Sequence, residues 1–385
     1  MVRALRKGTG PRTATAGCIR YHGRAGSSVV EHRTFNAVVD GSIPSRLTNF
    51  LAAEDARLIP DVASLKELLP AAGAELISVK MSPTDGLGAL KIKKGLLIVR
   101  DGMALPVVDG KTSTKLFVDL NEDKHGDILA APSASTGTIA SALFIKGSPN
   151  YYHFLAFNLP TLIFLKAQAA KGRVTLVTAQ GFPKSATTLM DALLPSIADN
   201  RPVEVRRIDD GTYDLADVVV PIKPPTAVVV ALNRALVIPF VMAQAGVTDP
   251  LRELGSVKLF VRRDQAINGR NLSNQSEVEA WFVARGYTSV NPGSLTMAEQ
   301  VLLFSRATHI AGIEGAAFAN ILFAVNAVHM VMISSPAVRD EKFFSALAKH
   351  SNVKFERVFG DAASPKRNAD FTLPMQNLEG LLERA

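Results

Sequence analysis

A regular alternation of short β-branched runs with helix-like stretches, between residues 257 and 359, constrains the fold most. Strands are predicted at residues 257–263, 287–290, 308–313, 327–334 and 353–359, with helices between them at residues 275–286, 296–307, 315–324 and 341–350. Four β-α units in succession predict an α/β fold with a parallel, doubly wound sheet. Ligands of such sheets bind at the carboxyl ends of the strands, so we expect the chemistry at that edge.

A less regular α/β pattern precedes these units. Predicted strands cover residues 95–100, 115–120, 138–147, 173–179, 203–208 and 214–221, with helices at residues 151–171 and 185–198. We expect one sheet with helices packed against it. The predicted domains are an N-terminal α/β domain over residues 50–240, a second over residues 241–360, and a C-terminal tail with a helix over residues 361–385.

The longest apolar run covers residues 227–247 and carries Asn233 and Arg234 at its middle. A membrane-spanning helix needs about 20 predominantly apolar residues without such a polar centre. We therefore interpret the run as a buried amphipathic helix that leads from the first domain to the second. The only cysteine, Cys18, is compatible with a reducing cytoplasm.

The net charge of +8 is concentrated in residues 1–48, which hold eight Lys and Arg residues against two acidic residues. No basic stripe remains elsewhere to indicate a nucleic-acid partner. This segment is acid-poor like an organellar targeting peptide. Residues 26–46 also resemble the conceptual translation of a transfer-RNA gene. We expect residues 1–48 to be disordered or non-native.

Two arginines close the first strand of the regular half. Arg262 and Arg263 are followed by Asp264 and by a polar loop that contains Arg270, Asn271 and Asn274. Two guanidiniums at the carboxyl edge of a sheet suit a diphosphate, because each offers planar bidentate donors. The alternative is a strand end with one solvated arginine and one paired with Asp264.

The stretch AGIEGAAFANILF, residues 311–323, has the strand-turn-helix pattern that often receives a phosphate. Gly315 permits a tight turn, and the amides after it, beginning with Ala316, are donors at a helix start. Glu314 either favours the helix dipole or places a carboxylate in the ligand cleft. Asn320 either reaches the same cleft or hydrogen-bonds within the layers.

In the first half, Asn150 is a predicted helix cap before Tyr151, Tyr152 and His153. A single histidine in an apolar helix is more often a packed core residue than a catalytic one. Its position at the helix start, beside two tyrosines, would also let it face a cleft.

Taken in order, these segments resemble glycosyltransferase family 61, which includes capsular polysaccharide biosynthesis proteins. The resemblance rests on Asn150 to Phe154, Val261 to Arg263, Asn274 with Gln275, Ala298 to Val301, and Gly312 to Asn320. It implies two facing Rossmann-like domains of the GT-B type, a nucleotide-sugar donor held mainly by the second domain, and inverting transfer without a catalytic metal or other cofactor.

By position, the resemblance implies donor-binding roles for Arg262, Arg263, Asn274, Gly315, Ala316 and Asn320. Asn150, Tyr151 and Tyr152 would lie on the acceptor side, and His153 would face the cleft. The family has a histidine where this chain has Glu314, a serine at Val261 and an acid at Gln275. His153 and Glu314 are therefore the two candidates for the general base.

We expect a glycosyltransferase that acts on a glycan acceptor in capsular or other surface polysaccharide synthesis. The expected location is the cytoplasm, with peripheral association at the inner face of the membrane. One alternative is a protein of the same fold that binds a nucleotide or glycan and whose catalysis is altered, as the change at Glu314 would suggest. A nucleotide-sugar epimerase is a second alternative, resting on fold alone.

Overall fold

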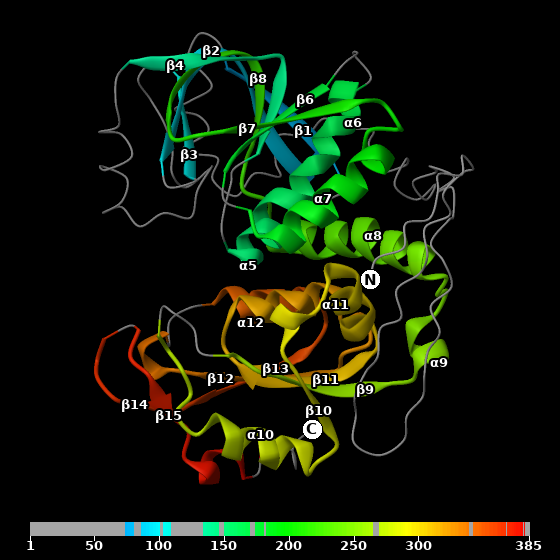
Figure 1. Ribbon diagram of the computed structural model, residues 1–385, viewed down its shortest axis with the longest axis vertical. Coiled ribbons are helices and arrows are strands. Elements are labelled where there is room, and N and C mark those ends of the chain that lie inside the picture. Colours follow the sequence, from blue (N-terminus) through cyan, green and yellow to red (C-terminus); the bar gives the residue numbers. More distant parts are fainter. Residues whose placement is uncertain are drawn as a thin grey trace, which may run out of the picture.

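The second half of the chain forms a five-stranded sheet in which every neighbouring pair is parallel. In the computed structural model its order is β10-β9-β11-β12-β13, formed by β9 (Val257–Val261), β10 (Tyr287–Val290), β11 (Ala307–Ile313), β12 (His329–Ser334) and β13 (Lys354–Phe359). The parallel sheet predicted from the sequence is confirmed. We call this sheet with its helices the C-terminal lobe (Figure 1).

Helices cover both faces of this sheet. One face packs against α11 (Met297–Ser305), η5 (Ala316–Phe323) and α12 (Phe343–His350), and the other against α10 (Gln275–Val283) and η7 (Met375–Leu378). Short 3₁₀ turns at η4 (Pro292–Ser294) and η6 (Pro336–Val338) complete the connections. The helix predicted at residues 315–324 is a 3₁₀ helix, η5.

The N-terminal lobe is built on an eight-stranded mixed sheet of order β1-β2-β8-β5-β6-β7, with β3 paired to β2 and β4 to β8. Its strands are β1 (Ala74–Lys80), β2 (Gly86–Arg100), β3 (Met103–Val107), β4 (Ser135–Ala140), β5 (Ala142–Ile145), β6 (Val174–Ala179), β7 (Val203–Ile208) and β8 (Gly211–Pro221). A single sheet was expected. The antiparallel strands β1 and β3 were not predicted, and β2 begins nine residues before the predicted strand.

The long helix predicted at residues 151–171 is divided into four consecutive pieces. They are α5 (Tyr151–His153), a π-helical turn η2 (Phe154–Asn158), a 3₁₀ turn η3 (Leu159–Ile163) and α6 (Phe164–Ala169). The cause is Pro160, because proline donates no amide hydrogen bond and its ring crowds the carbonyl four residues earlier. The helix predicted at residues 185–198 is α7 (Lys184–Ile197).

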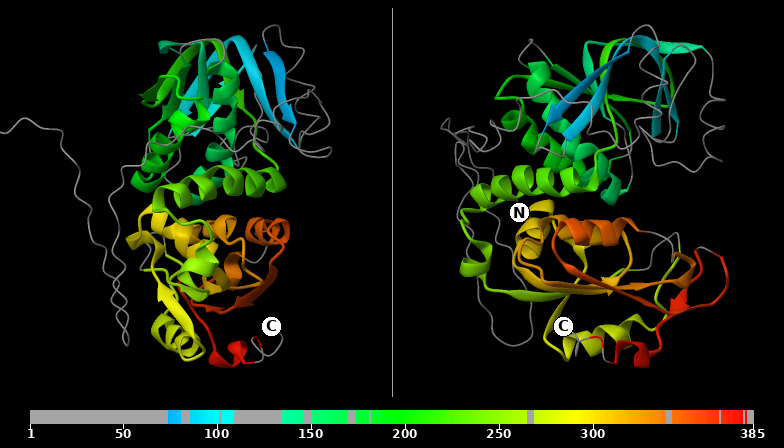
Figure 2. Two further views of the ribbon diagram at one scale, coloured as in Figure 1. Left: turned by 90° about the vertical axis from the view of Figure 1, so that its right-hand side faces the viewer. Right: turned by 180° about the vertical axis from the view of Figure 1, so that it is seen from behind.

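The helix α8 (Thr226–Ala245) lies between the lobes and is followed by α9 (Pro250–Leu254) (Figures 1 and 2). Its two central polar residues form hydrogen bonds with different lobes, Asn233 with the N-terminal lobe and Arg234 with the C-terminal lobe. Asn233 Nδ2 donates to the Leu155 carbonyl at 2.8 Å, and Arg234 Nε donates to the Leu322 carbonyl at 3.1 Å. Among the described residues, α8 alone is long and apolar enough to span a membrane. The predicted boundary at residue 240 falls inside it.

The C-terminal tail folds back onto the C-terminal lobe. The strands β14 (Asp361–Ala362) and β15 (Phe371–Thr372) pair as a short hairpin, and Phe371 bridges to Leu272 in the loop before α10. The helix predicted in the tail is the 3₁₀ turn η7.

The structure describes residues 74–80, 86–100, 103–108, 134–145, 150–169, 174–180, 182–264, 269–338, 342–366, 368–379 and 381. The N-terminal segment at residues 1–48 and the strand predicted at residues 115–120 lie outside these ranges.

Candidate functional site

The site expected at the sheet edge lies where the strand order reverses. From β9 the chain moves to β10 on one side, and β11 returns to the other side of β9. The ends of β9 and β11 are in register at Val261 and Gly312. A Cβ at Gly312 would lie 2.2 Å from the Val261 carbonyl oxygen, so only glycine permits this approach. The residues after both strands therefore lie together at the usual ligand-binding edge.

The two adjacent arginines point to different partners. Arg262 donates to the Asp264 carboxylate at 2.9 Å and lies 3.9 Å from Glu279 of α10. The hydrogen bond with Asp264 raises the pKa of Arg262. Arg263 donates instead to the backbone carbonyls of Glu314 and Gly269. The two guanidiniums of the predicted diphosphate site therefore have different partners within the protein, and the charge of Arg262 is balanced by Asp264 and Glu279.

Arg263 is half-buried beside the turn that follows β11. Its Nη1 donates to the Glu314 carbonyl at 2.7 Å and its Nη2 donates to the Gly269 carbonyl at 3.1 Å. A Cβ on Gly315 would meet the Arg263 side chain at 3.6 Å. That distance is an ordinary van der Waals contact and Gly315 has extended backbone, so neither space nor backbone conformation requires glycine at this turn. Ala316 then begins η5.

A second arginine of the same loop lies near Arg263. Burial lowers the pKa of Arg263 and the positive charge of Arg270 lowers it further, whereas the charges of Glu314 and Asp370 act in the opposite direction. Arg270 has a left-handed backbone (φ 62°), and its Nε is buried without a hydrogen-bond partner among the described residues. Repulsion between like charges makes this place favourable for an anion.

A pocket of about 610 Å³ adjoins Arg263 at the start of α10. Its lining is polar except for one leucine, and consists of Arg263, Asp264, Asn271, Leu272, Ser273, Gln275 and Asp370. Asn274 does not line this pocket, because the nitrogen and the oxygen of its side-chain amide both form hydrogen bonds with the C-terminal tail. Its Nδ2 donates to the Leu373 carbonyl at 2.9 Å, and its Oδ1 accepts from the Leu373 amide at 3.0 Å.

Glu314 is buried, with 4% of its surface exposed, and does not face the cleft as a base would. Its carboxylate lies 3.7 Å from Nη2 of Arg357 on β13, and its charge also favours the protonated form of Arg263. A buried carboxylate must be compensated by such partners. Arg357 was missed from the sequence, where an arginine inside the alternating strand KFERVF was its only signal.

Asn320 and Tyr151, expected on opposite sides of the cleft, contact each other. The Tyr151 hydroxyl donates to Asn320 Oδ1 at 2.7 Å, and Asn320 Nδ2 donates to Gln300 Oε1 at 2.8 Å. Asn320 is fully buried, and burial raises the pKa of Tyr151 well above its ordinary value. These side chains therefore join α5 to η5 and α11 instead of lining an open cleft.

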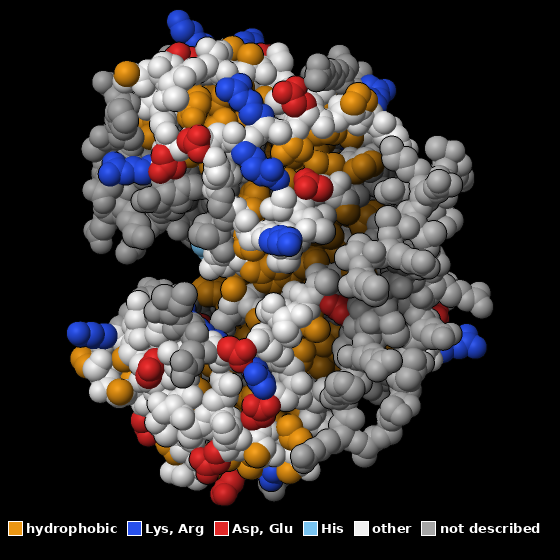
Figure 3. All heavy atoms as spheres, in the orientation of Figure 1, with side chains coloured by type: hydrophobic (Ala, Val, Ile, Leu, Met, Phe, Trp, Pro, Cys, Tyr) orange, Lys and Arg blue, Asp and Glu red, His pale blue; other side chains and the backbone are white. Residues whose placement is uncertain are grey.

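The cleft between the lobes has one wall from the N-terminal lobe, and the start of α5 forms this wall. Asn150 caps the helix by accepting from the Tyr152 amide at 2.9 Å, as predicted. The Tyr152 ring centre lies 5.1 Å from that of Phe343 at the start of α12, across the junction. His153 is half-buried, with its ring centre 5.8 Å from Tyr152 and 5.4 Å from Phe157. The surface is hollowed between the lobes on the side where α5 lies (Figure 3).

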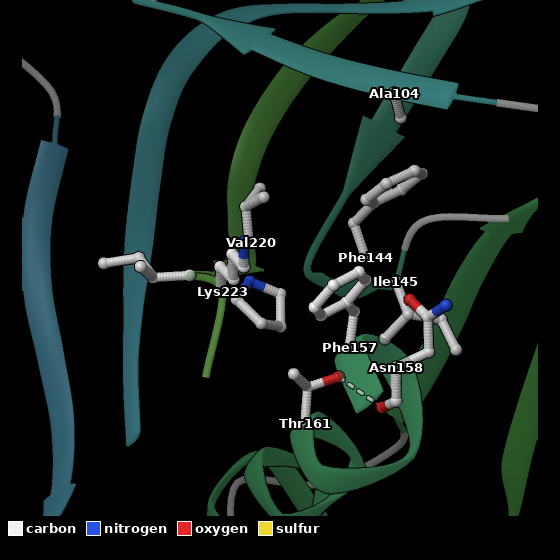
Figure 4. Close-up of a pocket in the computed structure, with 10 residues that line it drawn as sticks. Ala104, Phe144, Ile145, Phe157, Asn158, Thr161, Val220 and Lys223 are labelled. Atoms are coloured by element: carbon white, nitrogen blue, oxygen red, sulfur yellow. Dashed lines mark hydrogen bonds between the residues drawn. The ribbon is translucent and has the colours of Figure 1, made fainter. Parts of the chain in front are cut away.

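Behind His153, the π-helical turn η2 borders a cavity of about 20 Å³, enough for one water molecule. Figure 4 shows Phe157 pointing toward Phe144 of β5 inside it, while Thr161 bonds to the Asn158 carbonyl at 2.6 Å. Lys223 lies 5.2 Å from the Phe157 ring. The Phe157 ring, which contacts His153, is thus packed between Lys223 and Phe144. Within the described residues, no three His, Cys, Asp or Glu side chains form a group that could hold a metal ion.

Comparison with known proteins finds one family model that resembles part of the chain. The sequence model described as Glycosyltransferase 61 matches residues 151–331, from α5 into β12. None of the curated proteins compared matches the chain. Similar solved structures include a glycosyl transferase of family 9 from Veillonella parvula DSM 2008, with 10% identity over 60% of this chain and 87% of that one, at a TM-score of 0.30.

Another is the iron-containing dodecameric glycosyltransferase TibC from enterotoxigenic E. coli H10407. It has 12% identity over 72% of this chain and 80% of that one, also at a TM-score of 0.30. Scores this low inform neither mechanism nor substrate. The family match spans the α5 segment and the ends of β9 and β11, which carry the site described above. Over residues 151–331 the chain is thus similar to glycosyltransferase family 61, and we conclude that it is a glycosyltransferase.

Proposed function

We propose that this enzyme transfers a sugar from a nucleotide-sugar donor to a hydroxyl group of a glycan acceptor, with inversion and without a catalytic metal. The observation that carries the donor assignment is the pair Arg263 and Arg270 beside a polar pocket at the carboxyl edge of the parallel sheet. Two neighbouring guanidiniums provide the bidentate donors that a diphosphate binds, and they would stabilise the charge of the departing diphosphate.

The general base is His153 in this proposal. It lies half-buried at the end of α5, which packs against η5 directly after the Gly315 turn. Inversion needs a base on the acceptor side, opposite the leaving diphosphate. Glu314 is less suited to that role, because its carboxylate is buried against Arg357. We assign Glu314 to positioning the arginines.

The two lobes on either side of α8 are consistent with the GT-B arrangement that the sequence resemblance implies. The cytoplasmic location, the association with the inner face of the membrane and the role in capsular or other surface polysaccharide synthesis stay predictions from the sequence. So does the alternative of a nucleotide- or glycan-binding protein with altered catalysis, which the glutamate at position 314 favours.

Product analysis tests the proposal. The purified full chain is incubated with a panel of nucleotide sugars and candidate oligosaccharide acceptors, and products are identified by mass spectrometry and NMR. We expect a new glycosidic bond of inverted configuration that is lost in His153→Ala, while that variant still binds the donor. An isomerised donor, or binding without any product across the panel, would contradict the proposal.

A further inference from the structure

The pocket at the start of α10 has walls from two segments that are far apart in the chain. Arg263, Asn271 and Leu272 belong to the end of β9 and the following loop, whereas Asp370 belongs to the C-terminal tail. The family match ends at residue 331, so the tail lies outside the matched region. Figure 1 shows β15 beside the start of α10.

Backbone pairing fixes the tail in this place. The Phe371 amide donates to the Asn271 carbonyl at 3.0 Å, and the Ser273 amide donates to the Phe371 carbonyl at 2.8 Å. The Phe371 side chain is 2% exposed and belongs to the core under α10. At Gly360 a Cβ would lie 2.5 Å from the Thr372 carbonyl oxygen, so the hairpin is closely packed. Asp370 is therefore held rigidly at the pocket.

Asp370 uses only one of its oxygens within the protein. Its Oδ1 accepts from the Asn271 amide at 2.8 Å and from Asn271 Nδ2 at 3.1 Å. Its Oδ2 makes no hydrogen bond to any other residue that the structure describes, and the side chain is exposed at the pocket. The other acid of the lining, Asp264, already binds Arg262 and Asn291. Asp370 is thus the carboxylate that can receive a ligand.

A carboxylate can only accept hydrogen bonds, and it repels phosphate. The charge of Asp370 acts on Arg263, and its second oxygen is placed for a part of the ligand that is neutral and donates. In a nucleoside diphosphate that part is the ribose, whose vicinal hydroxyls are bound by an acidic residue in other α/β nucleotide sites. A lipid diphosphate has no such hydroxyls.

We propose that Asp370, which belongs to the C-terminal tail outside the matched region, binds the ribose hydroxyls of the nucleotide-sugar donor. This inference rests on the proposed function, because it requires the diphosphate at Arg263 and Arg270. It assigns to the C-terminal tail the recognition of the ribose.

Calorimetry on the full chain tests this inference with UDP, GDP, CDP and ADP, their 2′-deoxy counterparts, and inorganic pyrophosphate. Hydrogen bonds to charged groups correspond to about 10- to 100-fold in affinity, so we expect the best ribonucleotide to bind that much tighter than its 2′-deoxy form. Asp370→Asn keeps the acceptor for Asn271, and we expect it to lose most of that preference without weakening pyrophosphate. Asp361→Asn, on the exposed part of the same hairpin, is the matched control and should keep the preference.

The outcomes separate the two claims. If Asp370→Asn retains the full preference for ribose while Arg270→Ala weakens every ligand, the inference about Asp370 is wrong and the diphosphate site stands. If Arg270→Ala changes nothing, or the wild-type chain binds none of these nucleotides, both claims fail.

Discussion

Glu314 is a buried anion whose partner Arg357 lies two strands away in the sheet. The sequence correctly places Glu314 at the strand end, but a general base would have to be exposed to the acceptor. The side chain of Glu314 is instead 5% exposed, and that of Arg357 is 10% exposed. Its role is therefore better tested by stability than by activity alone.

We predict that Glu314→Gln lowers the free energy of unfolding by about 3 kcal/mol, because it leaves the Arg357 charge buried without its carboxylate. Arg357→Met should have a similar effect, and the double variant should lose less than the sum of the two. Urea denaturation measures all three. An unchanged stability of Glu314→Gln, together with a large loss of turnover, would instead identify Glu314 as the base.

At the scale of elements, β11, β12 and β13 bring a row of ionisable side chains together at the amino ends of the sheet. His309 and His329 are paired in register, and Glu356 lies 3.2 Å from the Nε2 atom of His329. Burial lowers the pKa of both histidines below 6.5, with Lys258 and Lys354 acting in the same direction and Glu356 opposing it.

A histidine whose folded pKa is depressed contributes stability above its unfolded pKa, and that stability is lost as the pH falls. We predict that the free energy of unfolding decreases as the pH is lowered below about 6.5, and that His329→Gln makes the decrease shallower. His350→Gln, at the exposed end of α12, is the control and should retain the wild-type pH dependence. Chemical denaturation at a series of pH values measures the slope. Equal slopes for wild type and His329→Gln would contradict the account.

The elements also show what could be predicted from the sequence. Strong alternation of β-branched runs and helices located β9 to β13 to within a few residues, and the signal is clearest for β11 and β12, which are mostly buried on both faces. The helix at residues 151–171 was predicted as one piece because its apolar pattern continues through Pro160. Arg262 and Arg263 were predicted as a pair because adjacency in sequence does not show which partners each side chain has. The Glu314–Arg357 pair depends on strand order and could not be inferred from local pattern.

At the scale of the whole molecule, polar side chains fix the two lobes against each other. Tyr151 of the N-terminal lobe donates to Asn320 of the C-terminal lobe, and Asn320 is fully buried. This contact also sets the position of α5, and hence of His153, relative to the turn at Gly315. The placement of His153, the proposed base, relative to the donor site thus depends on the hydrogen bond between Tyr151 and Asn320.

We predict that Tyr151→Phe lowers the free energy of unfolding by about 1 to 3 kcal/mol, because it leaves a buried amide oxygen without its donor. Tyr287→Phe is the matched control, since the Tyr287 hydroxyl makes no hydrogen bond to another described residue. Urea denaturation compares the two variants. Equal losses, or no loss in Tyr151→Phe, would show that this contact does not hold the lobes.

The central claim is that Arg263 and Arg270, and not Arg262, hold the diphosphate of the donor. Isothermal titration calorimetry with the tightest-binding nucleoside diphosphate tests it most directly, on single alanine variants of the three arginines. We predict that Arg263→Ala and Arg270→Ala each weaken binding by about 10- to 100-fold, while Arg262→Ala stays close to wild type. Unchanged affinity in both of the first two variants, or a loss confined to Arg262→Ala, would contradict the claim.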